Sequence, residues 1–196
     1  MKNNVGLAVA IGALLLSVST TTAQDSTPIT TVGNWTIAYD SSIRGCFAVT
    51  SYNSGTILRF GYDGVDGNNP YYLMFGNPSW GSIEPGKDYE LSLQLDRAAP
   101  WGVTAVGSMM GNLPVLILSG SNFDFLTEFT KKHLLTVHWG SRNIGGFSLK
   151  DTHRATAEIS KCQLEIEDAI TDPFASPPKE KPITRPSPKA ADPFAI

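Results

Sequence analysis

Apolar and polar residues alternate along most of the middle of the chain. The alternation is clearest at residues 89–95, where Tyr89, Leu91, Leu93 and Leu95 share one parity and polar residues take the other. A period of two is typical of a β-strand with one buried face. Weaker alternation predicts further strands at residues 35–39, 46–52, 56–62, 71–75, 101–106 and 134–139. Residues 115–118 are apolar throughout, which predicts a strand covered on both faces.

Turn-forming residues separate the predicted strands, as at residues 53–55, 63–64, 85–86 and 111–112. Many short strands joined by such turns are typical of an antiparallel β-sandwich or barrel. The sequence therefore predicts a mainly β fold of one of these two kinds, with two short helices.

The first predicted helix lies at residues 121–132, where Phe125 and Phe129 stand four residues apart. Ser121 followed by Asp124 predicts the cap at its start. Because strict alternation determines which strand face is buried, we expect the two phenylalanines to share one core with strand residues. The expected strand members of that core are Tyr89, Leu91, Leu93, Leu95, Val115 and Ile117.

The second predicted helix begins at about Thr152. Its apolar residues recur at helical spacing: Ala155, Ile159, Cys162 and Ile166. This stripe can pack on the sheet and bring Cys162 toward Cys46.

The start of the chain resembles an export signal. Met1 and Lys2 precede an uncharged apolar run at residues 5–18, and small residues lead to Ala23. This order predicts a secretory signal peptide over residues 1–23, cleaved after Ala23. The apolar run has about 14 residues where a membrane-spanning helix needs about 20, so we expect no integral membrane span. The predicted location is the periplasm or the exterior.

Export determines how the two cysteines are interpreted. In an oxidising compartment a lone pair, Cys46 and Cys162, predicts a disulfide. Metal binding is the alternative, but two sulfurs 116 positions apart without a nearby histidine pair do not resemble a zinc site. We therefore expect a globular domain over residues 24–170, closed by one disulfide, with no metal and no cofactor.

The composition changes after Ile170. Seven of the thirteen prolines lie in residues 171–196, which predicts a disordered Pro-rich tail. Setting aside Lys2 and the seven charged residues of the tail leaves ten basic and fifteen acidic residues. A domain with a net charge near −5 is not expected to bind nucleic acid, since phosphate binding needs clustered Lys and Arg.

Two places in the sequence are candidate partner contacts. The tetrapeptide Asp-Pro-Phe-Ala occurs twice in the tail, so Phe174 and Phe194 are candidates for bivalent docking to an envelope or secreted protein. The alternative is that the tetrapeptide repeats by chance in a segment of biased composition. Trp80 stands in an apparent loop, where it either contacts a partner or covers the end of the core.

A family resemblance follows from Trp35, Cys46 and the run at residues 147–151 that leads into an alanine-containing helix. These features, mainly within residues 123–162, resemble the exported bacterial proteins of the invasion-associated locus B group. The resemblance implies a small periplasmic or secreted bacterial protein without a known catalytic centre, and it transfers no site residue.

Two function classes remain. The first is a non-catalytic envelope-associated protein that binds a partner or supports the cell surface. The second is an exported hydrolase with a dispersed site, motivated only by His138 and Asp151 with hydroxyl groups nearby. The chain contains no nucleophile-elbow motif, and we expect the protein not to be an enzyme.

Overall fold

The computed structural model describes residues 26–68 and 70–171. The predicted signal peptide, the tail beyond Thr171, and the two candidate residues Phe174 and Phe194 lie outside the described residues.

Ten strands and two helices make up the regular structure of the described residues. In chain order they are β1 (Ser26–Val32), β2 (Trp35–Asp40), β3 (Gly45–Ser51), β4 (Ile57–Tyr62), β5 (Tyr71–Gly76), β6 (Asp88–Leu95), β7 (Trp101–Met110), β8 (Leu113–Gly120), α1 (Phe123–Lys131), β9 (Leu134–Trp139), β10 (Arg142–Ser148) and α2 (Thr152–Thr171). The mainly β prediction is confirmed. Helix α2 is longer than expected, at 20 residues.

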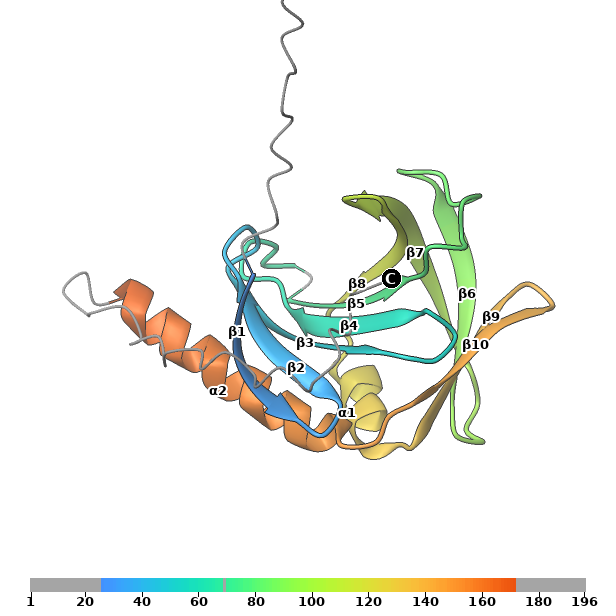
Figure 1. Ribbon diagram of the computed structural model, residues 1–196. Helices are drawn as coiled ribbons and strands as arrows, with labels where there is room; N and C mark the ends of the chain where they lie inside the picture. The colour runs from blue at the N-terminus through green and yellow to red at the C-terminus, as the bar shows by residue number, and fades with distance from the viewer. Residues whose placement is uncertain (1–25, 69, 172–196) are drawn as a thin grey trace, which may run out of the picture.

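All ten strands belong to one antiparallel sheet in the order β1-β2-β3-β4-β5-β8-β7-β6-β9-β10. The sheet is not closed into a barrel, because β1 and β10 are unpaired edges in this order. Strands β6, β7 and β8 follow one another directly and return β8 to the side of β5, which is a Greek-key connection. Figure 1 shows the curved sheet with both helices on the same side of it.

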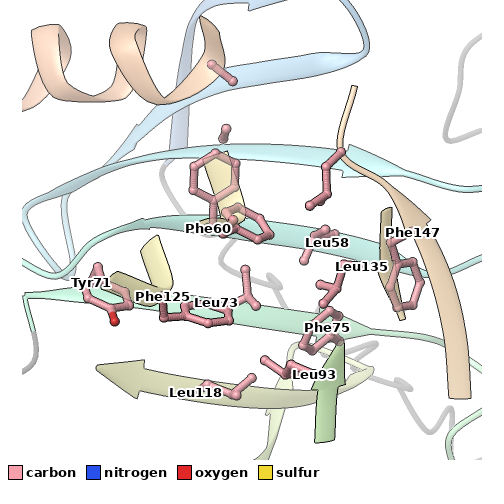
Figure 2. Close-up of a cluster of buried hydrophobic side chains, with 14 of the residues drawn as sticks. Leu58, Phe60, Tyr71, Leu73, Phe75, Leu93, Leu118, Phe125, Leu135 and Phe147 are labelled. Atoms are coloured by element: carbon pink, nitrogen blue, oxygen red, sulfur yellow. The ribbon is translucent and has the colours of Figure 1, made fainter. Parts of the chain in front are cut away.

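The sheet face that meets the two helices, called here the first face, carries the main core. Phe60 of β4 meets Phe129 of α1 edge to face, with 5.2 Å between ring centroids. Elsewhere in the core, the ring centroids of Phe75 of β5 and Phe147 of β10 are 5.5 Å apart. Figure 2 shows these strand side chains converging with Phe125 of α1. The predicted core members confirmed here are Tyr89, Leu91, Leu93, Leu95, Phe125 and Phe129.

The prediction that Val115 and Ile117 share this core is wrong. Both belong to a smaller cluster on the opposite sheet face, called here the second face, while Leu116 and Leu118 of the same strand face the main core. Because β8 is apolar at every one of these positions, its sequence does not distinguish the two faces. Val115 and Leu116 are only 1% and 3% exposed, which agrees with a strand covered on both faces.

The N-cap of α1 lies one residue later than predicted. Asn122 caps the helix in place of Ser121. Its side-chain Oδ1 accepts hydrogen bonds from the backbone N–H groups of Asp124 and Phe125. Asn and Ser are equally good caps, so the sequence alone did not separate two neighbouring candidates.

Helix α2 is fastened along β2 and β3. At its start, the indole Nε1 of Trp35 donates a 2.9 Å hydrogen bond to the carbonyl of Lys150. Further along, the disulfide joins Cys162 to Cys46 with 6.0 Å between the Cα atoms, which confirms the predicted pairing. The side chain of Gln163 accepts from the Cys46 N–H and donates to the Arg44 carbonyl. The helix therefore runs from the Trp35 end of β2 to the β2–β3 turn.

Loss of the disulfide should destabilise the domain without changing its fold. Replacing both cysteines by alanine should lower the free energy of unfolding by about 2 to 5 kcal/mol, because the unfolded chain regains the freedom of a loop of on the order of 100 residues. Urea unfolding followed by far-UV circular dichroism measures the loss. An unfolding midpoint equal to that of the oxidised protein would contradict this prediction.

Leu93 tests the main core directly. Leu93→Ala should cost about 2 to 5 kcal/mol, because the side chain is fully buried and its removal leaves a cavity. Leu164→Ala is the matched control, since Leu164 is 62% exposed on α2 and should change stability by less than about 0.5 kcal/mol. Equal losses in the two variants would show that β6 is peripheral to the core.

Candidate functional site

The second face of the sheet is the candidate functional site. Its buried residues come from β2, β3, β5 and β8: Ala38, Phe47, Tyr72, Met74 and Val115. Partly buried apolar residues surround them: Ile43, Val49, Met110, Leu113 and Ile117. Strand pairing places Val106 beside Ile117, so this apolar surface continues onto β7, where Val106 is 44% exposed.

Pairing between strands explains why these residues gather on one face. Val49, Arg59, Met74 and Ile117 lie side by side on β3, β4, β5 and β8. Side chains at equivalent positions of neighbouring strands point to the same face of a sheet. One row of the second face is thus apolar except at Arg59.

Arg59 is buried in the middle of this row, at 8% exposure. Its Nη2 donates to Oδ2 of Asp40 at 2.7 Å, and its Nε donates to the Tyr72 hydroxyl at 2.5 Å. The guanidinium carbon lies 3.6 Å from the centre of the Phe47 ring. Asp40 also accepts hydrogen bonds from the backbone N–H and the hydroxyl of Ser42. Both members of the ion pair therefore have further contacts: Arg59 with Tyr72 and Phe47, and Asp40 with Ser42.

Burial and the ion pair shift the ionisation of the groups around Arg59. Burial by itself would raise the pKa of Asp40, but the hydrogen bonds and positive charge of Arg59, with the hydrogen bonds from Ser42, outweigh it and lower the pKa below its usual value. Burial raises the pKa of Tyr72 to about 12. At neutral pH the cluster holds one cation, one anion and a neutral phenol.

These properties limit what the Arg59 cluster itself can do chemically. Arg59 and Asp40 already hold each other, and Tyr72 stays protonated, so none of the three is poised as a general acid or base. Val106, Val49 and Ile117 offer apolar surface beside them. Sequence reasoning missed this site, because Arg59 stands between Leu58 and Phe60 and resembles the outward position of a half-buried strand.

A second hollow lies where the end of β10 meets β2 and β3. It has a volume of about 200 Å³ and is lined by Asn34, Trp35, Thr50, Ser51, Tyr52, Asn53, Ser148 and Lys150. The Tyr52 hydroxyl donates to the Ser148 carbonyl at 2.8 Å, and the Trp35 indole is bonded to Lys150. Because its aromatic polar groups already bind the chain, and because pockets for small molecules usually reach about 300 Å³ or more, the second face is the stronger candidate.

The two residues behind the hydrolase alternative, His138 and Asp151, lie on separate elements. His138 lies on β9 between Ser92 of β6 and Asn143 of β10. Asp151 precedes α2 and contacts Arg154 through its carboxylate. Within the described part of the chain, no hydrogen bond or ion pair joins His138 to Asp151.

Trp80 lies in the loop between β5 and β6, half-buried against the main core. Its backbone carbonyl accepts a hydrogen bond from the Ile83 N–H, which shapes the loop. This position agrees with the interpretation of Trp80 as a cover for the core, while its role as a partner contact stays a prediction.

Metal-binding clusters and membrane-spanning helices are two features that would indicate a particular kind of site. Residues 26–68 and 70–171 hold no cluster of three or more His, Cys, Asp or Glu side chains arranged to bind a metal ion. In the same ranges, none of the helices combines the length and apolar character needed to cross a bilayer. Comparison of the chain with protein-family models, curated proteins and solved structures found no match.

The buried ion pair makes a prediction for stability and its pH dependence. Arg59→Met should lower the free energy of unfolding by about 3 to 5 kcal/mol at pH 7, because it leaves Asp40 buried without its cation. The lowered pKa of Asp40 means that wild-type stability from this group is present above its usual value of 3.8 and is lost as the pH falls through the lower folded value. The deficit of Arg59→Met should therefore shrink toward acid pH.

The double variant Asp40→Asn with Arg59→Met is the control. It should regain much of the lost stability, since no buried charge is then unpaired. Chemical unfolding of the wild type and the two variants at pH 7 and at about pH 3, below the usual pKa of Asp40, measures both effects. A double variant no more stable than Arg59→Met would show that the unpaired charge of Asp40 is not the cause of the loss.

Proposed function

We propose that this protein is an exported, non-catalytic protein of the bacterial envelope, periplasmic or secreted, that binds a partner through the second face of its sheet. Three features support the proposal. The first 23 residues carry the pattern of a signal peptide. The domain is closed by a disulfide, which is typical of oxidising compartments. The resemblance to the invasion-associated locus B group points to the same location.

The second face is the observation that carries the proposal. A ten-stranded sheet whose helices both pack on the first face leaves the apolar row of Val49, Met74 and Ile117 outside the described helical cover. Val49 and Ile117 are half-buried and Val106 is 44% exposed, so the edge of this face keeps accessible apolar surface, which is a feature of interaction sites. The face therefore supports binding by hydrophobic packing.

The chemistry of the face favours an extended apolar segment of an envelope protein as the partner. Met74 and Met110 supply flexible, polarisable side chains that adapt to different shapes. Arg59 is saturated by Asp40 and Tyr72, so it offers little attraction to an acidic ligand. Trp80 and the tail residues Phe174 and Phe194 remain further proposed contacts.

Site-specific photo-crosslinking tests this function. A photoreactive phenylalanine analogue is placed at Val106, the exposed edge of the second face, in the full chain expressed in its own host. The same analogue at Leu164 is the matched control, because Leu164 is apolar and more exposed, at 62%, but lies on α2. Irradiation should give a defined cross-link to an envelope protein from Val106 only.

Each result decides the proposal. Val106 cross-links that map to an apolar segment of one envelope protein support it. Cross-links that are the same from Val106 and Leu164, or absent from Val106, would overturn the assignment of the second face as the binding surface. The hydrolase alternative is not proposed: Ser92 lies beside His138 in the β6–β9 pairing, but within the described residues no hydrogen bond or ion pair joins His138 to a carboxylate.

A further inference from the structure

The hollow where the end of β10 meets β2 and β3 is a candidate site separate from the second face. Its strand side consists of the start of β2 and the end of β3, because the pairing of Thr36 with Val49 brings Trp35 next to Thr50. Its other side is the connection from β10 to α2. The hollow therefore lies between segments that are far apart in the sequence and that the fold holds together.

Two hydrogen bonds join the two sides of the hollow. The Trp35 indole donates to the Lys150 carbonyl, and the Tyr52 hydroxyl donates to the Ser148 carbonyl. Tyr52 also packs on Phe147, with 5.1 Å between the ring centroids. Both aromatic side chains are thus fixed before a ligand arrives, and a preorganised site loses less conformational entropy on binding.

Thr50 is the clearest indication that the hollow takes a polar ligand. The residue is only 8% exposed, yet its hydroxyl makes no hydrogen bond within the described chain. No fully buried side-chain oxygen of the described residues lacks a partner, so the Thr50 Oγ1 is reached from outside. Because Thr50 lines the hollow, the hollow is the route to it. A recessed hydroxyl offers one donor and two acceptor positions to an entering molecule.

The rim of the hollow carries further polar side chains without partners. Asn34, Ser51, Asn53 and Lys150 are exposed, and no side-chain hydrogen bond or ion pair joins them to another described residue. Amides and hydroxyls both donate and accept, so they match a ligand rich in hydroxyl groups. Of the described residues that line the hollow, Lys150 alone is charged. An ammonium only donates, so it favours an anionic group on the ligand.

The charge of Lys150 is available to a ligand. The adjacent residue, Asp151, carries the carboxylate closest to it in the sequence. That carboxylate contacts the guanidinium of Arg154 at 3.4 Å and lies against Gly33 of the β1–β2 turn. Asp151 is therefore already paired with another cation.

The volume of the hollow limits the ligand to one small ring. About 200 Å³ corresponds to about seven water molecules at about 30 Å³ each. Sites for drug-sized molecules are larger, at about 300 Å³ or more. A single pyranose ring has the required size, with hydroxyl groups around its edge and a C–H face that can pack on the half-buried ring of Tyr52.

We propose that this hollow binds a hexuronate unit, which is a pyranose ring that carries a carboxylate. Thr50 binds a ring hydroxyl inside the hollow, Lys150 pairs with the carboxylate, and the two asparagines bind the remaining hydroxyls at the rim. An acidic peptide side chain fits less well, because its two oxygens would leave the Thr50 hydroxyl and the asparagine amides unused. The site is independent of the second face and of the partner proposed for it.

Titration followed by amide NMR tests the proposal on the mature chain, residues 24–196. The probes are the methyl glycosides of glucuronic and galacturonic acid, the corresponding neutral glucosides and galactosides, and sodium acetate. The variants are Lys150→Gln, Thr50→Val and Lys161→Gln. Lys161 is the matched control, since it is also exposed and without a side-chain partner in the described chain but lies on α2 away from the hollow.

One of the two hexuronates should shift the amide signals around the hollow in a saturable way and bind more tightly than its neutral counterpart or acetate. Lys150→Gln should weaken the hexuronate about fivefold and leave the neutral sugar unchanged, since an exposed charge pair contributes modestly. Thr50→Val should weaken both sugars at least about fivefold, because a ligand hydroxyl is left without its partner. It should change the melting temperature by less than about 2 °C, because the hydroxyl has no partner in the protein.

Four outcomes would overturn the proposal: no saturable shift at the hollow, acetate binding as tightly as the hexuronates, equal weakening by Lys150→Gln and Lys161→Gln, or unchanged affinity in Thr50→Val. If Thr50→Val does not fold, the two lysine variants decide. A trimer of galacturonate identifies the source of the unit. Tighter binding of the trimer than of the single sugar assigns the site to a glycan chain, equal binding assigns it to the free acid, and both results keep the site.

Discussion

Strands β2, β3, β5 and β8 carry apolar side chains on both faces, and removal of both faces from water is the constraint on which the rest of the structure depends. On the first face, α1, α2 and the β9–β10 hairpin supply the cover. Their rings and aliphatic side chains interlock with the sheet, as Phe60 does with Phe129. Both described helices lie on this one side, so the two faces of the sheet differ in what covers them.

Arg59 shows how a charged side chain can belong to an apolar surface. Its flat guanidinium lies on the ring of Phe47, while its edge is held by Asp40 and Tyr72. A guanidinium is weakly hydrated and stacks on aromatic rings, so it shields the ring from water as it satisfies its own hydrogen bonds. A lysine ammonium lacks the planar fork needed for both contacts.

Local patterns predicted much of the fold, and long-range pairing decided the rest. Residues 89–95 form a strand with the expected buried face, because strict alternation leaves one solution. Strand β10 escaped prediction because Gly145 interrupts its alternation at a bulge, and Pro28 stands at a similar irregularity in β1. The contact of Arg59 with Asp40 joins different strands, so neither residue carries a local signal of it. The second face was hidden for the same reason.

The disulfide also has a consequence for the order in which the molecule is assembled. A chain is made from its N-terminus, so Cys46 emerges 116 residues before Cys162. During that interval β3 has no covalent partner and is held only by pairing with β2 and β4. Oxidation can join the pair only after Cys162 has been made, so the bridge forms late in the assembly of the molecule. Because the sequence contains no third cysteine, Cys46 can form an intramolecular disulfide with Cys162 alone. No incorrect intramolecular bridge can form before Cys162 is made.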